Sequence, residues 1–173
     1  PEDLDGLKVR VAGSTSAEVA EALGATPVQM PINQVYNAMQ TGLIDGVITG
    51  ASTLSDFKLD EVANSYTLGA NLGRLVFYTV MTQSTYDALP DDQKAAIDEV
   101  AGVPLSQSAE DAWNATADSA MQAARDSGDN TIVDLSEEEA QAFSDAVAEV
   151  TQAYVDEVGG QAVLDAMQAD QGS

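Results

Sequence analysis

Apolar residues recur at every second position in residues 7–11, and this period of two predicts a β-strand. Residues 26–30 and 43–48 are further short apolar runs, and each predicts another strand. The stretches between these runs carry apolar residues at helical spacing and end at Gly24 and Gly42, as helices commonly do. The order strand–helix–strand–helix–strand predicts a parallel, doubly wound α/β sheet.

Capping residues predict where several helices begin. Thr15, with Glu18 three residues later, fits a capping box for the first helix, and its neighbours Ser14 and Ser16 could also be the cap. Asn33 is the expected cap of the second helix. Residues 131–135 predict a later strand. Ser136 and the three glutamates that follow it form another capping box, so we expect a helix to begin there.

The middle of the chain follows a different pattern. Residues 75–81 are almost continuously apolar and predict a buried strand. A helix is expected to begin at Pro90 or Asp91. The helical pattern then extends towards Arg125, and the interruption at 102–104 predicts a kink or a boundary between two helices.

Composition and charge limit the class of protein and its partners. The 173 residues are 45% apolar, which is enough for the core of one domain or two small lobes. The 29 acidic and 6 basic residues give a formal charge of −23, which repels nucleic acid and anionic membranes. No apolar run approaches the ~20 residues of a membrane helix. We therefore expect no nucleic-acid partner and a protein that is not embedded in a membrane, and the surplus of acid suggests a saline or marine habitat.

Cysteine and histidine are both absent from the sequence. Disulfides, zinc sites, Cys–His nucleophiles and histidine bases are therefore excluded. We predict no metal site, no cofactor and no catalytic residue. An enzyme that uses a carboxylate such as Asp45 as its general base remains an alternative, because α/β sheets carry many chemistries.

Arg10 is the residue that points most directly to a function. It lies at the end of the first predicted strand, just before a Ser/Thr-rich turn and a helix start. Ligands of such sheets bind beyond the carboxyl ends of the strands, and the free N–H groups of a helix start attract anions. An arginine there predicts a site for a carboxylate or a phosphate. The plainer alternative is a surface ion pair worth ~0–1 kcal/mol.

The order of motifs along the chain resembles the substrate-binding proteins of TRAP (tripartite ATP-independent periplasmic) transporters, which include the C4-dicarboxylate receptors. The segments that carry the resemblance are residues 6–11, 23–31, 35–46, 57–62, 86–94 and 130–136. The resemblance covers essentially the whole chain. It implies a periplasmic-binding-protein fold, in which two α/β lobes are joined by hinge strands and a long connecting helix.

The resemblance also implies how the chain is divided. Residues 1–73 and 128–173 would form the second, C-terminal lobe of the family fold. Residues 74–127 would supply a hinge strand and the connecting helix, and would contribute to a first lobe that is mostly absent. The chain would then be about the C-terminal half of a mature protein, with Pro1 at an interior position.

The family resemblance implies a set of ligand-binding residues. The arginine of the family's Lys-x-Arg-Val strand pairs with the ligand's carboxylate, and Arg10 holds that position. Thr49 and Ser52 replace the amide and the proline of the family's next important turn, which favours a small carboxylate over a sialic acid. Two further candidates come from their positions in the chain and not from the resemblance: Arg74, before the predicted hinge strand, and Ser14, at the helix start. A solvent-exposed hinge residue and a helix cap are their plainer roles.

The predicted function is that of an extracytoplasmic solute receptor in the periplasm. It would bind a small organic anion, a mono- or dicarboxylate, and deliver it to the membrane subunits of a TRAP-type secondary transporter. A stand-alone acidic interaction module without a small ligand is the second alternative, beside the carboxylate-based enzyme.

Overall fold

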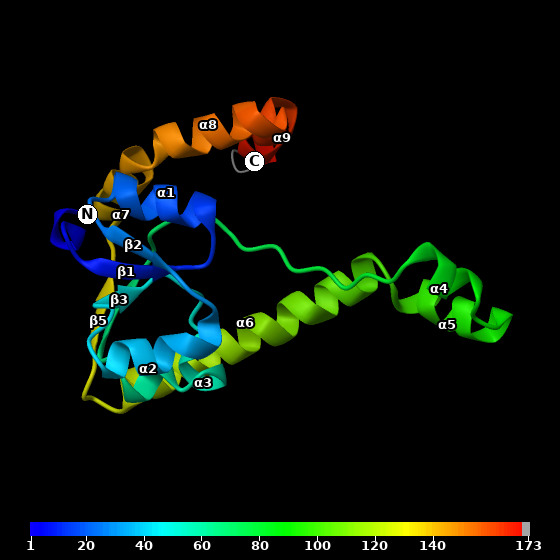
Figure 1. The fold of residues 1–173 in the computed structure, drawn as a ribbon, viewed down its shortest axis with the longest axis horizontal. Coiled ribbons are helices and arrows are strands. Elements are labelled where there is room, and N and C mark those ends of the chain that lie inside the picture. The colour runs from blue at the N-terminus through cyan, green and yellow to red at the C-terminus, as the bar shows by residue number, and fades with distance from the viewer. Residues whose placement is uncertain (171–173) are drawn as a thin grey trace.

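The computed structural model describes residues 1–170, apart from the side chains at 168 and 170. The strands are β1 (Lys8–Val11), β2 (Thr26–Gln29), β3 (Gly46–Val47), β4 (Ser65–Leu68) and β5 (Thr131–Asp134). The α-helices are α1 (Ser14–Ala22), α2 (Val35–Gln40), α3 (Thr53–Asp56), α4 (Gln83–Asp87), α5 (Asp91–Val100), α6 (Val103–Asp126), α7 (Glu137–Ala146), α8 (Ala148–Val158) and α9 (Gln161–Asp170). Three short 3-10 turns lie at Glu2–Leu4, Ile32–Gln34 and Leu59–Glu61. These elements form a body around the strands and an arm that leaves it (Figure 1).

The first sheet has the strand order β2-β1-β3, and both of its strand pairs are parallel. The chain moves from β1 to β2 on one side and then crosses back to β3 on the other. Because such crossovers are right-handed, the reversal places α1 and α2 on opposite faces of the sheet, as Figure 1 shows. The predicted doubly wound α/β fold is confirmed, and its topological switch point lies between β1 and β3.

Each face of this sheet is covered by a hydrophobic cluster. Val9 and Val11 of β1 pack with alanines of α1 and the loop before β2. The larger cluster lies on the opposite face and joins α2, α3, β4 and the end of α6, with Val28 and Val47 at its margin. Since successive strand residues point to opposite faces, Arg10 lies on the face of this larger cluster.

The second sheet is the parallel pair β4–β5, in which Tyr66 lies opposite Ile132. The sequence pattern predicts β5 but not β4. The carboxylate of Asp134, at the end of β5, accepts two hydrogen bonds from Arg125 of α6, so the strand and the helix are joined on the surface as well.

The helix starts agree only in part with the predicted caps. The first helix is capped by Gly13 and not by Thr15, because the Gly13 carbonyl accepts the first helical bond from the backbone N–H of residue 17. Asn33 does not cap α2 either, since it lies inside a 3-10 turn that precedes that helix. The capping box of Ser136 and Glu139 is confirmed, with reciprocal side-chain to backbone bonds.

The predicted buried strand at 75–81 is wrong for the described structure. This segment is extended but unpaired, and Val76 and Tyr78 are each 81% exposed. A strand needs a neighbour for its backbone hydrogen bonds, and no described strand pairs with this one. Its clearest contact is the ring of Phe77, which stacks on Trp113 of α6 with centroids 4.6 Å apart.

The arm consists of this extended segment, the helix pair α4–α5 at its far end, and α6, which returns to the body (Figure 1). The predicted helix boundary at 102–104 is confirmed, because Gly102 has a positive φ of 69° and separates α5 from α6. Pro104 is tolerated in the first turn of α6, where no partner for its missing N–H is needed. Across residues 1–170, no helix combines the length and the apolarity that a membrane crossing requires.

Candidate functional site

Arg10 lies near the carboxyl end of the central strand β1, level with Val28 of β2 and Val47 of β3. It is only 5% exposed, and it is the one charged residue that is buried in the described part of the chain. Burying an unpaired charge is costly, so a buried guanidinium in this place requires an explanation.

The contacts of Arg10 leave part of its guanidinium unused. Its Nε donates a hydrogen bond of 2.9 Å to the carbonyl oxygen of Met30, just beyond β2. No ion pair reaches Arg10 from the residues that the structure describes. Among these residues Ser52 Oγ is the one fully buried side-chain polar atom without a partner. The two terminal nitrogens of Arg10, which have no partner among the described residues, are therefore not fully enclosed.

Burial lowers the pKa of the Arg10 guanidinium from its ordinary value, because desolvation disfavours the charged form. An arginine nevertheless stays protonated in proteins. The site therefore presents a permanent, partly desolvated positive charge at the carboxyl edge of the sheet, where an anion gains more from the pairing than it does in water.

Two other basic residues are already paired with carboxylates. Arg125 binds both oxygens of Asp134, and the Lys58 ammonium lies 3.9 Å from Glu61. Lys94 donates to the carbonyl of Asp87 in the arm. Lys58 and Arg125 are exposed and Lys94 is half-buried, whereas Arg10 is buried and forms no ion pair with any residue that the structure describes.

The pairing of β1 with β3 places the turn at 49–52 at the same edge of the sheet as Arg10. The backbone N–H of Ile48 donates to the Arg10 carbonyl at 3.0 Å, so Thr49, which is exposed, follows directly. Ser52 is 2% exposed, and its buried Oγ is out of reach of a solute in this conformation. The neighbouring Thr53 donates to the carbonyl of Gly50 at 2.7 Å and helps to hold the turn.

Ser14 and Arg74 lie farther from this arrangement. Ser14 is exposed in the first turn of α1, on the face opposite the Arg10 side chain. The hydrogen bond of Arg10 thus goes to the end of β2 and not to the start of α1. Arg74 is exposed in the extended segment that leaves the body. Sequence reasoning missed the contact between Arg10 and Met30, because Met30 contributes its backbone carbonyl and not its side chain. The only signal in the sequence at this position is the proline that follows Met30.

Asp45 occupies the opposite edge of the same sheet. Its carboxylate accepts the backbone N–H of Lys8 at 2.9 Å, and its own N–H donates to the Lys8 carbonyl. Lys8 begins β1 and Arg10 lies near its end, so Asp45 belongs to the amino edge. The structure gives Asp45 a role in holding β1 to β3, which removes the basis for treating it as a general base beside Arg10.

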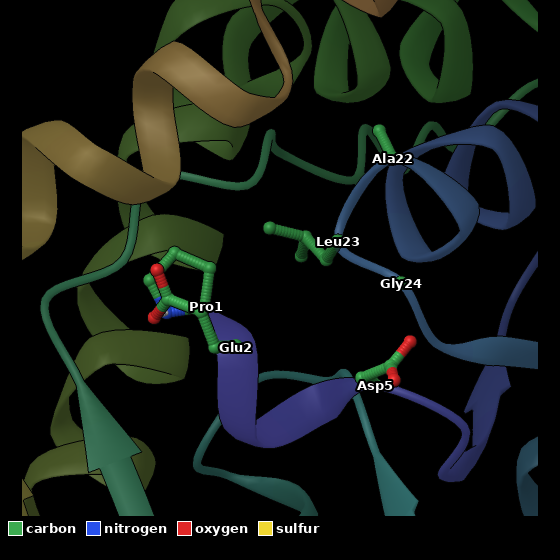
Figure 2. A pocket seen from close by; sticks show the side chains of 6 residues that line it. All are labelled: Pro1, Glu2, Asp5, Ala22, Leu23 and Gly24. Carbon is green, nitrogen blue, oxygen red and sulfur yellow. Dashed lines mark ion pairs between the residues drawn. The ribbon is translucent and has the colours of Figure 1, made fainter.

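A hollow at this amino edge is lined by Pro1, Glu2, Asp5, Ala22, Leu23 and Gly24. Figure 2 shows Leu23 pointing toward Pro1 across it. Its two carboxylates disfavour an organic anion. A second hollow, between the α3 region and the end of α6, carries Asp60, Glu61 and Asp129 and is acidic as well. No cluster of acidic side chains within the described residues has the arrangement of a metal site.

Comparisons with known proteins show the family to which the chain belongs. Residues 1–157 match the bacterial extracellular solute-binding proteins of family 7. A C4-dicarboxylate-binding periplasmic protein from Rhodobacter capsulatus is 29% identical over 164 residues, which are 94% of this chain and 49% of that protein.

Two solved structures are similar in fold as well as in sequence. A TRAP periplasmic solute-binding protein from Shewanella oneidensis with bound succinate is 31% identical with a TM-score of 0.82, over 96% of this chain and 54% of that one. A TRAP solute-binding protein from Rhodoferax ferrireducens with co-purified benzoate is 28% identical with a TM-score of 0.78, over 92% and 51%.

The chain spans about half the length of the relatives it matches. These relatives are solute-binding receptors and not enzymes. Since the family match extends over most of the sequence, the chain belongs to family 7 of the bacterial extracellular solute-binding proteins, the family of the TRAP solute receptors.

Proposed function

We propose that this chain is part of a periplasmic receptor that binds a small organic carboxylate at Arg10 and delivers it to the membrane subunits of a TRAP transporter. The observation that carries the proposal is the state of Arg10. It is the one buried charge among the described residues, it lies at the topological switch point of a doubly wound sheet, and no carboxylate of the described chain pairs with it.

The ligands of similar proteins support a carboxylate. The R. capsulatus relative is a C4-dicarboxylate-binding protein, and the two solved structures hold succinate and benzoate. A planar guanidinium can donate two parallel hydrogen bonds to such a group. With one buried cation at this edge, the described part of the chain offers a place for one carboxylate. The rest of a dicarboxylate would need donors from elsewhere in the protein.

The exposed arm supports the division into two lobes, in which residues 1–73 and 128–173 form one lobe and 74–127 reach into the other. Leu75, Val76, Phe77, Tyr78 and Val80 are all more than half exposed, although residues of this kind are normally buried. We propose that the first lobe supplies the strand that pairs with this segment. The two lobes would then close over Arg10 and exclude water from its ion pair.

The remaining predicted ligand residues are part of the same proposal. Thr49 is exposed and follows the residue whose backbone pairs with Arg10, and Ser52 would contribute only if the turn at 49–52 rearranges when the solute binds. Ser14 would act through the N–H groups at the start of α1, and Arg74 from the hinge. Arg10 is the anchor, and these four residues would set the selectivity.

The experiment is calorimetric titration of the full-length protein with succinate and with benzoate, preceded by a thermal-shift screen of a wider set of acids. A bound acid that is not consumed raises the melting temperature. Arg10→Ala is expected to weaken binding of the best acid by ~2–5 kcal/mol, as loss of one member of a desolvated charge pair does. Arg125→Ala removes the same charge from a surface pair and should leave the affinity unchanged.

The three function classes predict different results. Equal affinities of the wild type and Arg10→Ala would overturn the assignment of Arg10. Turnover of an added acid would favour an enzyme, and no stabilisation by any acid would favour the acidic interaction module.

A further inference from the structure

The guanidinium of Arg10 has two edges at which a carboxylate can bind. A side-on carboxylate uses Nε together with one terminal nitrogen, and an end-on carboxylate uses both terminal nitrogens, Nη1 and Nη2. In this structure Nε is already occupied, because it donates to the carbonyl oxygen of Met30 at 2.9 Å. The terminal nitrogens have no partner among the described residues and are not fully enclosed.

The Met30 carbonyl is a fixed acceptor. Pro31 follows it with φ −59° and ψ 146°, and a proline restricts the residue before it to extended conformations. The Pro31 carbonyl in turn accepts the N–H of Gln34 at 3.1 Å, which closes the 3-10 turn. The Met30 side chain packs at the margin of the larger hydrophobic cluster. The acceptor is therefore held from both sides before any solute arrives.

We propose that the Met30–Pro31 segment positions Arg10 so that it receives a carboxylate end-on, through Nη1 and Nη2 alone. The inference rests on the proposed function in that it takes the solute to be a carboxylate bound by Arg10. End-on binding fixes the orientation of the solute. The carbon skeleton must extend from its carboxylate away from the Arg10 Cζ and away from the end of β2. Met30 and Pro31 are thus positioning residues, and the recognition element is the free edge of the guanidinium.

The same chain contains an end-on pair that shows this geometry. Arg125 donates from Nη1 and Nη2 to the two carboxylate oxygens of Asp134, at 3.0 and 2.6 Å. Both partners of that pair are exposed. Arg10 differs because it is buried and its orientation is set by a backbone carbonyl. A guanidinium that is held in this way loses little further freedom when it binds a carboxylate.

Exchange of the arginine Nε–H protons, followed by NMR of the ¹⁵N-labelled full-length protein, tests the inference. Signals of Arg10, Arg74 and Arg125 are assigned from single Arg→Lys variants. The Nε–H of Arg10 is expected to exchange at least about tenfold more slowly than that of Arg74, which is exposed and has no partner in the described chain. Addition of succinate or benzoate should shift the Arg10 Nη signals and leave its Nε–H protected.

Pro31→Ala releases Met30 from its restriction and should raise the exchange rate of the Arg10 Nε–H by a few-fold, with a parallel loss of affinity for the acid. Pro90→Ala, which changes a proline at the start of α5 in the arm, is the matched control and should change neither quantity.

An Arg10 Nε–H that exchanges as fast as that of Arg74, or that loses its protection when the acid binds, would overturn the positioning role. Protection of Nε–H together with no effect of any acid on the Nη signals would support the positioning role and count against the proposed function. The two failures are therefore distinguishable.

Discussion

Arg10 and Ser52 are both buried, but they differ in whether a ligand can reach their polar atoms. The guanidinium keeps one hydrogen bond and a partly open edge, so a ligand can satisfy it. The hydroxyl of Ser52 is fully enclosed and has no partner. A buried unsatisfied hydroxyl costs stability, and a residue that keeps this cost is a candidate for a functional role in another conformation.

Substitution of Ser52 tests this difference at the level of one residue. Ser52→Ala removes the unsatisfied hydroxyl and is expected to leave stability unchanged or raise it by about 1 kcal/mol. Thr53→Val is the matched variant, because it removes a hydroxyl that donates to Gly50 at 2.7 Å, and it should lower stability by about 1 kcal/mol. Urea unfolding measures both. A clear loss of stability in Ser52→Ala would show that its hydroxyl has a partner.

At the level of elements, a side-chain pair that contains no cation recurs on the surfaces of the helices. Each pair lies within a single helix. A glutamine Nε2 donates to the Oδ1 of an aspartate four residues later, at 2.7 to 2.9 Å, in Gln83–Asp87, Gln107–Asp111, Gln122–Asp126, Gln141–Asp145, Gln152–Asp156 and Gln161–Asp165. Such pairs stabilise a helix by ~0.2–0.5 kcal/mol each. They take the place of the usual glutamate–lysine pairs in helices that have few basic residues.

The junction between α6 and β5 predicts a dependence on pH. Hydrogen bonds from Arg125 lower the pKa of the Asp134 carboxyl below its ordinary value of 3.8. A carboxyl with a lowered folded-state pKa contributes stability above its unfolded pKa, and this contribution is lost as the pH falls through the folded value. The contribution of Asp134 should therefore be complete at neutral pH and disappear at pH values below 3.8.

Asp134→Asn is the variant that isolates this contribution. It should unfold at a lower urea concentration than the wild type at pH 7, and the difference should shrink as the pH is lowered below 3.8. Because both partners are exposed, the difference at pH 7 is expected to be small. If the difference in stability between the wild type and Asp134→Asn stays constant from pH 7 to pH 2, the Arg125–Asp134 pair does not have this role.

On the scale of the whole molecule, the net charge of −23 opposes the compact state. Salt weakens this repulsion, because the screening length falls from about 30 Å at 0.01 M to about 3 Å at 1 M. The melting temperature of the full-length protein is therefore expected to rise with sodium chloride. Sucrose at matched osmolarity, which does not screen charge, is the control. A melting temperature that falls with salt would mean that the few ion pairs outweigh the repulsion.

Local patterns in the sequence determined much of the fold. The alternation in residues 7–11, the capping box at Ser136 and the break at Gly102 depend on neighbouring residues only, and all three were predictable. The order of strands and helices then implied a parallel sheet with a ligand edge. Arg10 could be selected at this stage because a lone cation at a strand end is visible without coordinates.

Only the tertiary structure decided the features that depend on distant partners. Strand β4 forms because β5, more than sixty residues later, pairs with it, whereas residues 75–81 remain an unpaired extended segment in spite of a stronger apolar pattern. The hydrogen bond from Arg10 to Met30 joins residues 20 positions apart, and the burial of Ser52 depends on packing around α3. A hydrogen bond depends on two partners, and burial depends on the residues packed around a side chain. The sequence can therefore identify Arg10 as the cation, but only the structure shows which edge of its guanidinium stays free.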